Sequence, residues 1–159
     1  MPIKKIGQLI LAIGVCEFVG VIGSVFTFEA IPNWYSTLQK PALNPPSWVF
    51  APAWTMLYAL MGISVFLMYQ KGWKRKEGKR ALVIFGVQLF LNAIWSLIFF
   101  GLRLPGFALV DILLLWIAIL VTIITFEKIS KPAAWLLLPY LLWVSFAAYL
   151  NFAIFYLNQ

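Results

Sequence analysis

Residues 106–126 read GFALVDILLLWIAILVTIITF and carry a single charged side chain, that of Asp111. A helix rises about 1.5 Å per residue, so this stretch alone matches the hydrocarbon core of a bilayer, which is about 30 Å thick. The run lacks the alternation of polar and apolar residues that strands of a membrane barrel show. It therefore predicts a helix that crosses a membrane.

The rest of the chain repeats this pattern. Of its 159 residues, 64% are hydrophobic and only 11% are charged, whereas a soluble domain has about 25% charged residues. The first apolar run is interpreted as a retained helix and not as a signal peptide, because of its length, the Glu17 in its middle and the lack of a small-residue cleavage site. We expect one all-α membrane domain over residues 1–159, a bundle of five transmembrane helices with spans near residues 6–28, 48–70, 81–101, 106–126 and 133–156.

Basic residues gather on one side of this predicted bundle. The amino terminus and the second and fourth loops share that side and hold ten of the twelve Lys and Arg residues, while the other side has only Lys40 and Arg103. Because positively charged loops stay in the cytoplasm, this bias predicts a cytoplasmic amino terminus in a bacterial inner membrane. The net charge of +7 is therefore interpreted as an orientation signal that touches anionic lipid, and nucleic acid is not expected as a partner.

The connection over residues 29–47 is the one long loop in this layout. Loops beyond about 12–15 residues are usually functional or disordered. This loop holds Trp34, Tyr35, Pro41, Pro45 and Pro46, a composition too stiff and too aromatic for a disordered linker. We expect an ordered lid over the outer end of the bundle. The alternative is an interfacial anchor, since Trp and Tyr favour the headgroup level.

Several chemistries are excluded by what the sequence lacks. It contains no histidine and one cysteine, Cys16, so the usual zinc, haem or iron–sulfur sites cannot be built and no metal is expected. No phosphate-binding glycine loop and no nucleophile elbow is present. The sequence therefore shows no conventional catalytic site, and no cofactor is expected to be required.

Polar and aromatic side chains recur at spacings of three and four within the spans, which places them on single helix faces. They are Trp54 and Tyr58 in the second span, Gln88, Asn92, Trp95 and Ser96 in the third, and Tyr140, Trp143, Ala147 and Asn151 in the fifth. Most fall in the outer half of the bundle, beneath the lid, with Trp143 expected to lie deeper. Flat apolar walls with a few polar groups are what a ligand pocket needs. Two alternatives stay open, namely aromatic packing and hydrogen bonds that hold the helices together.

Glu17 is the other polar feature of the spans. It shares a helix face with Gly20 and Ser24, and a carboxylate at this depth costs about 2.5–3.5 kcal/mol. Either it serves as a proton or ligand site, or it is protonated and hydrogen-bonded to a neighbouring helix. We favour the second interpretation.

Specific strings resemble the translocator protein family, also called tryptophan-rich sensory proteins or peripheral benzodiazepine receptors. The likeness begins in the lid with Trp34-Tyr35, with residues 38–41 (LQKP) and with residues 44–48 (NPPSW). It continues through most of the remaining chain. The further matches are Pro52, residues 53–54 (AW), 57–58 (LY), 88–89 (QL), 91–92 (LN), Trp95, residues 99–101 (FFG), 108–111 (ALVD), 139–140 (PY), Trp143, residues 146–147 (FA) and 150–151 (LN).

The resemblance implies a five-helix bundle, commonly a homodimer, that binds porphyrins and isoquinoline or benzodiazepine-type ligands beneath the first loop. Carried over residue by residue, the implied ligand-binding side chains are Trp54, Tyr58, Gln88, Asn92, Trp95, Trp143 and Ala147, with Tyr35, Pro41 and Pro45 closing the pocket. Some relatives are reported to degrade protoporphyrin in light, and the residues matching Trp54 and Trp143 are implicated there. Animal members carry a cholesterol motif that ends in a basic residue, whereas here no Lys or Arg follows Tyr156. The resemblance therefore does not extend to sterol transport.

Three functions follow as hypotheses. The first is a membrane receptor or carrier that binds a porphyrin of the protoporphyrin type, for transport, sensing or disposal. The second is a light- and oxygen-dependent porphyrin-degrading enzyme, with Trp54 and Trp143 as the catalytic residues. The third is a regulatory scaffold for another membrane protein.

Overall fold

The computed structural model describes residues 3–159, which are helical and contain no β-strand. The elements are α1 (Ile3–Asn33), the 3-10 turns η1 (Tyr35–Thr37) and η2 (Ser47–Val49), α2 (Phe50–Gly72), α3 (Lys76–Ser96), the π-helical η3 (Leu97–Gly101), α4 (Pro105–Glu127), α5 (Lys131–Trp135) and α6 (Leu138–Leu157). Within residues 3–159, five helical segments are long and apolar enough to cross a membrane, α5 and α6 together forming the fifth. The predicted five-helix membrane bundle is confirmed.

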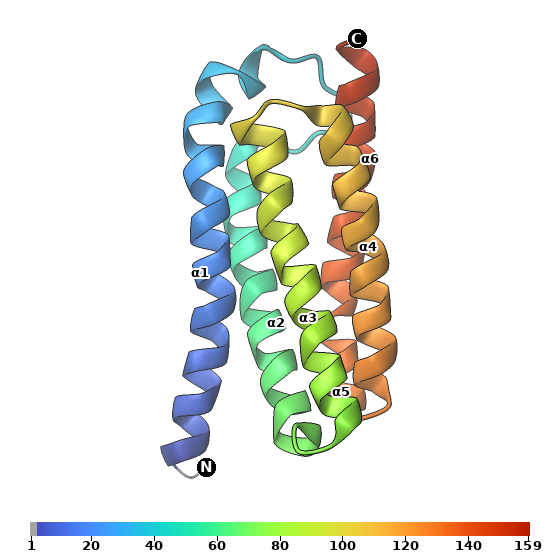
Figure 1. Cartoon of the computed structure of the whole chain (residues 1–159). Helices are drawn as coiled ribbons and strands as arrows, with labels where there is room; N and C mark the ends of the chain where they lie inside the picture. The colour runs from blue at the N-terminus through green and yellow to red at the C-terminus, as the bar shows by residue number, and fades with distance from the viewer. Residues whose placement is uncertain (1–2) are drawn as a thin grey trace.

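The helices stand side by side and close into a ring that departs from chain order. Helix α1 packs against α2, α2 against α5 and α6, α6 against α4, α4 against α3, and α3 against α1. Figure 1 shows the amino terminus at one end of the bundle and the carboxyl terminus at the other, with the connection between α1 and α2 at the carboxyl-terminal end. We call that end the outer end, following the predicted orientation, and the other the inner end.

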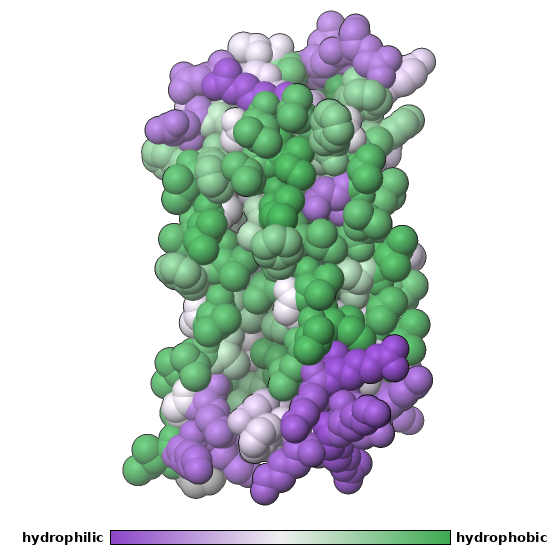
Figure 2. Space-filling view, viewed as in Figure 1, coloured by the Kyte–Doolittle hydropathy of each residue, from purple (hydrophilic) through white to green (hydrophobic). Residues whose placement is uncertain are grey.

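The surface of the bundle is apolar over most of its length. Figure 2 shows a broad hydrophobic belt between two hydrophilic ends. Large apolar side chains on several helices are exposed within the belt, among them Phe18, Phe90 and Leu142. Burying such surface in lipid is favourable, whereas exposing it to water is costly. The protein is therefore an integral membrane protein in contact with the bilayer.

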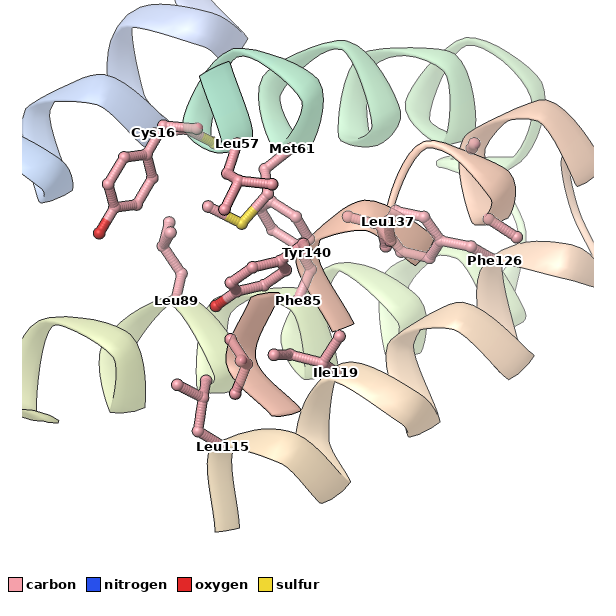
Figure 3. Close-up of a cluster of buried hydrophobic side chains, with 14 of the residues drawn as sticks. Cys16, Leu57, Met61, Phe85, Leu89, Leu115, Ile119, Phe126, Leu137 and Tyr140 are labelled. Atoms are coloured by element: carbon pink, nitrogen blue, oxygen red, sulfur yellow. The ribbon is translucent and has the colours of Figure 1, made fainter. Parts of the chain in front are cut away.

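The interior is filled by side chains from every spanning helix. The main cluster joins Cys16 of α1, Met61 of α2, Phe85 of α3, Ile119 of α4 and Tyr140 of α6 (Figure 3), each at most 6% exposed. Phe85 and Phe126 stack with centroids 5.8 Å apart. Packing of this kind, which does not depend on water, holds membrane helices together.

Helix α1 is longer than its predicted span, and the loop is correspondingly shorter than residues 29–47. The charge of Glu29 ends the apolar run at residue 28, but the helix continues to Asn33 and the Trp34 amide still bonds to the carbonyl of Ala30 at 2.9 Å. The Asn33 side chain bonds to the Glu29 carbonyl at 3.0 Å. Hydropathy locates where a helix leaves the hydrocarbon, and not where its hydrogen bonding stops.

The fifth predicted span, residues 133–156, is broken into two helices. Helix α5 ends at Trp135 and α6 begins at Leu138, with Pro139 in its first turn. Proline has no amide hydrogen to donate to the carbonyl four residues before it, so the helix is interrupted there. Helix α6 runs from this break to the outer end of the bundle, where the candidate site lies.

Candidate ligand cavity

A chain of hydrogen bonds crosses the middle of the bundle. The Tyr58 hydroxyl donates to Oδ1 of Asn92, the Nδ2 of Asn92 donates to the Tyr140 hydroxyl at 2.7 Å, and that hydroxyl donates to Oε1 of Gln88 at 2.9 Å. All four residues are at most 5% exposed. Polar groups inside a membrane need partners, and here α2, α3 and α6 provide them for one another. We call this chain the polar floor.

Above the polar floor lies a cavity of about 340 Å³. This volume is within the range of roughly 300–1,000 Å³ that is usual for small-molecule sites. The wall is formed by the outer halves of α1, α2, α3 and α6, by η3 and by the loop. Its residues are Glu17, Gly20, Val21, Gly23, Ser24, Thr27, Phe28, Ile31, Tyr35, Ser47, Phe50, Ala51, Trp54, Thr55, Tyr58, Trp95, Ser96, Phe99, Phe100, Trp143, Ala147, Leu150, Asn151 and Ile154.

Two aromatic groups make up much of the wall. In the first, Trp54 meets Tyr58 at 5.7 Å and Trp143 edge-on at 6.5 Å, and Trp143 also meets Phe50 at 6.4 Å. Trp143 lines the cavity about one turn above Tyr140 of the polar floor, and so lies deeper than Asn151 of the same helix. Its Nε1 is buried and has no hydrogen-bond partner within residues 3–159. An unpartnered buried donor in a cavity wall is suited to an acceptor atom of a ligand.

The second aromatic group lies on the α3 side. Trp95 stacks on Phe99 at 5.1 Å and meets Phe100 edge-on at 5.9 Å. The indole Nε1 of Trp95 donates to Oδ1 of Asn151 at 3.0 Å, and Asn151 in turn donates to the Pro105 carbonyl at 2.8 Å. These bonds tie α3, α6 and the start of α4 together, so the ring of Trp95 is held in one orientation.

The loop closes the outer end of the cavity, as expected of a lid. Tyr35 is 4% exposed, lines the cavity and donates its hydroxyl to Oδ1 of Asn44 at 2.7 Å. Burial raises the pKa of the Tyr35 phenol. Gln39 and Asn158 bond reciprocally at 2.9 Å in both directions, which fastens the loop to the end of α6.

The predicted site residues fall into three places. Tyr35, Trp54, Tyr58, Trp95, Trp143 and Ala147 line the cavity. Gln88 and Asn92 lie in the polar floor, where their amides are already engaged. Pro41 and Pro45 lie in the loop away from the wall, and the Pro45 carbonyl accepts a bond from Nδ2 of Asn44 at 3.1 Å. The prolines therefore shape the segment that holds Tyr35.

Several wall residues do not stand out in the sequence. Phe99 and Phe100 appear there only as part of a family string, because adjacent residues do not share one face of a regular α-helix. The π-helical turn of η3, closed by the Leu102 amide on the Leu97 carbonyl at 2.8 Å, brings both rings to the wall. Helix α1 also contributes, and the shared face of Glu17, Gly20 and Ser24 was the signal for it.

The model of the TspO/MBR family matches residues 12–157. The tryptophan-rich protein TspO of Chlorobaculum tepidum is 50% identical over 155 residues, covering 98% of each chain. The translocator protein of Bos taurus is 40% identical over 141 residues, covering 88% of this chain and 83% of the bovine one. The tryptophan-rich sensory protein of Cereibacter sphaeroides is 35% identical over 145 residues, covering 89% of each chain.

Proposed function

Since the chain belongs to the TspO/MBR family, we propose that it is a membrane receptor or carrier that binds a planar tetrapyrrole of the protoporphyrin type in the cavity beneath its first loop. The observation that carries the proposal is the pair of aromatic groups around Trp54 and Trp95, which both line the same cavity. Flat aromatic side chains stack well on a flat conjugated ring and need few polar contacts to hold it.

Two polar features suit the edge of such a ligand. The unpartnered Nε1 of Trp143 offers a donor to a carbonyl or carboxylate oxygen. Lys40 lies at the outer edge of the site, with its Nζ 4.8 Å from the centre of the Tyr35 ring and bonded to the Leu38 carbonyl at 3.0 Å. A cation beside the closed end of the cavity suits the propionate groups of a porphyrin. Isoquinoline or benzodiazepine-type compounds are proposed as further ligands of the same apolar wall.

The test replaces Trp143 with Phe and measures binding by titration of the purified protein with protoporphyrin in dim light. Trp143→Phe keeps an aromatic ring but removes the Nε1 donor and part of the stacking area, so we expect affinity to fall about tenfold, which corresponds to about 1.4 kcal/mol. Trp135→Phe is the matched control, because Trp135 is 69% exposed and lies outside the wall. Equal affinities of the two variants would contradict the site, and absence of saturable binding to the unchanged protein would contradict the function.

A second candidate function is favoured by the edge contact between Trp54 and Trp143. Two indoles beside a bound porphyrin place an oxidisable group next to a molecule that absorbs light. In this function, dioxygen oxidises the illuminated porphyrin ring. Loss of porphyrin absorbance should then require light and dioxygen, and it should slow when Trp54 and Trp143 are both changed to Phe. Equal loss in the dark would exclude this candidate while leaving the receptor or carrier proposal intact.

A further inference from the structure

Helices α1 and α2 pack tightly over their inner halves and separate over their outer halves. A Cβ built on Gly62 of α2 would lie 2.5 Å from Cα of Ile13, so the two backbones are in contact there. Further outward, a Cβ on Gly20 would lie 2.5 Å from the ring of Tyr58. Beyond that level the cavity lies between the helices, with Ser24 on one side and Thr55 on the other.

Some residues of the cavity wall are also on the outside of the protein. Val21 is 58% exposed and Phe28 is 84% exposed, and Ser24 and Thr55 are exposed as well. On the opposite wall, by contrast, Phe99 is only 2% exposed. Side chains that both line a cavity and lie on the surface mark its opening. The cavity therefore opens sideways, between α1 and α2, into the part of the surface that lipid covers.

The outer end, which faces water, is closed. Tyr35 is buried beneath the loop and bonded to Asn44, and the reciprocal bonds between Gln39 and Asn158 fasten the loop to α6. A ligand that came from water would have to break these contacts. A ligand already dissolved in the bilayer meets no such obstacle at the sideways opening.

The rim of the opening suits an apolar molecule. The Ser24 hydroxyl donates to the Val21 carbonyl at 2.7 Å, and the Thr55 hydroxyl donates to the Ala51 carbonyl at 3.0 Å. Both hydroxyls are thus engaged with their own helices, and the rim presents mainly carbon to its surroundings. A ligand that passes between Ser24 and Thr55 therefore meets no free hydroxyl.

We propose that ligands enter and leave the cavity sideways from the bilayer, through the opening between the outer halves of α1 and α2. This inference rests on the proposed function for the identity of the ligand, and it narrows the ligand class to molecules that partition into membranes. The kinetics and the affinity of binding then depend on different parts of the cavity. The rim controls the rate constants of ligand association and dissociation, whereas the aromatic wall controls the dissociation constant.

The test obstructs the rim reversibly. Ser24→Cys is made in a Cys16→Ala background, placed in lipid vesicles and modified with benzyl methanethiosulfonate, which dithiothreitol removes. Association and dissociation of protoporphyrin are followed by its fluorescence. We expect the rate constants of association and dissociation both to fall by about tenfold or more, with full recovery after reduction. Leu113→Cys is the matched control, because Leu113 is exposed on α4 and lies outside the wall.

A second variant acts in the opposite direction. Phe28→Ala removes the most exposed ring of the rim, and it should raise the rate constants of association and dissociation about threefold. If the benzyl group fills the cavity and abolishes binding, this variant still tests whether ligands pass the rim. Rate constants that do not respond at the rim, but rise when Asn158→Ala loosens the loop, would overturn the proposal in favour of entry from water.

A ligand-independent measurement separates this inference from the proposed function. Lipids brominated on their acyl chains quench the fluorescence of the tryptophans that they reach. The part of this quenching that is lost in Trp54→Phe belongs to Trp54, and it reports whether lipid reaches the cavity. We expect that share to disappear when the Ser24→Cys variant carries the benzyl group. If protoporphyrin does not bind, the proposed function fails, and this quenching alone shows whether the cavity is open to the bilayer. If brominated lipid does not quench Trp54 in the unmodified protein, the proposed sideways opening is overturned.

Discussion

Asn92 shows how a polar residue inside a membrane protein can serve the site without lining it. Its side chain accepts from Tyr58 and donates to Tyr140, so it links three helices beneath the cavity. The sequence placed Asn92 on one face with Gln88 and Trp95, but spacing alone cannot separate a residue that binds a ligand from one that binds a neighbouring helix. That distinction depends on which side chains of α2 and α6 reach it, and helix periodicity carries no such information.

Replacing Asn92 with Ala is expected to destabilise the bundle by about 1–2 kcal/mol, because it leaves the buried Tyr58 hydroxyl without a partner. The free energy of unfolding in mixed detergent micelles measures this change. Tyr149→Phe is the control, since Tyr149 is 44% exposed and outside the polar floor. In a double-mutant cycle, Tyr58→Phe and Asn92→Ala should be non-additive. Strict additivity would contradict the bond between them.

The loop between α1 and α2 is the element in which sequence and structure differ most usefully. Its aromatic and proline content predicted an ordered lid, and the long apolar runs correctly predicted five spanning helices. The extension of α1 to Asn33 and the break before Pro139 were not predicted, because hydropathy reports burial in lipid and not backbone hydrogen bonding. The contact of Gln39 with Asn158 joins residues 119 positions apart, and no local pattern indicates such a pair.

The lid should loosen at alkaline pH through Tyr35. Its pKa is raised above the ordinary value of 10.0, so the folded lid favours the protonated phenol, which donates to Asn44. The stabilisation is present in full below pH 10 and is lost as the pH rises through the raised pKa. In a pH titration, the tyrosinate absorbance of Tyr35 is obtained by subtracting the signal of Tyr35→Phe from that of the unchanged protein. This difference should appear at a higher pH than the signal of the exposed tyrosines. A difference signal that appears with the exposed tyrosines would contradict a closed lid.

At the scale of the whole molecule, the basic residues and the lid lie at opposite ends of the bundle. The basic residues of the α2–α3 turn and of the α4–α5 connection lie at the end opposite the lid, where Figure 2 shows a hydrophilic cluster. A bilayer with anionic lipid on its cytoplasmic face favours this end inside. The cavity would then belong to the outer leaflet.

This orientation is tested by reporters fused to the carboxyl terminus. In a bacterial inner membrane, alkaline phosphatase placed after Gln159 should be active and green fluorescent protein at the same position should be dark, because only the first matures outside the cytoplasm. Changing the basic residues of the α2–α3 turn to Gln should lower the share of chains that insert with the carboxyl terminus outside; these residues are Lys74, Arg75, Lys76, Lys79 and Arg80. A fluorescent carboxyl-terminal fusion of the unchanged chain would contradict the proposed orientation.

The order of the helices in the ring also bears on how the protein is made. Because α5 and α6 lie between α2 and α4, the ring stays open until the last part of the chain has been synthesised. Until then Asn92 and Gln88 lack the hydroxyl of Tyr140, and Trp95 lacks Asn151. A chain without α6 thus leaves part of the hydrogen-bonding capacity of Asn92, Gln88 and Trp95 unmet inside the membrane, which is costly. In this architecture, the cavity is complete only once α6 has inserted between α2 and α4.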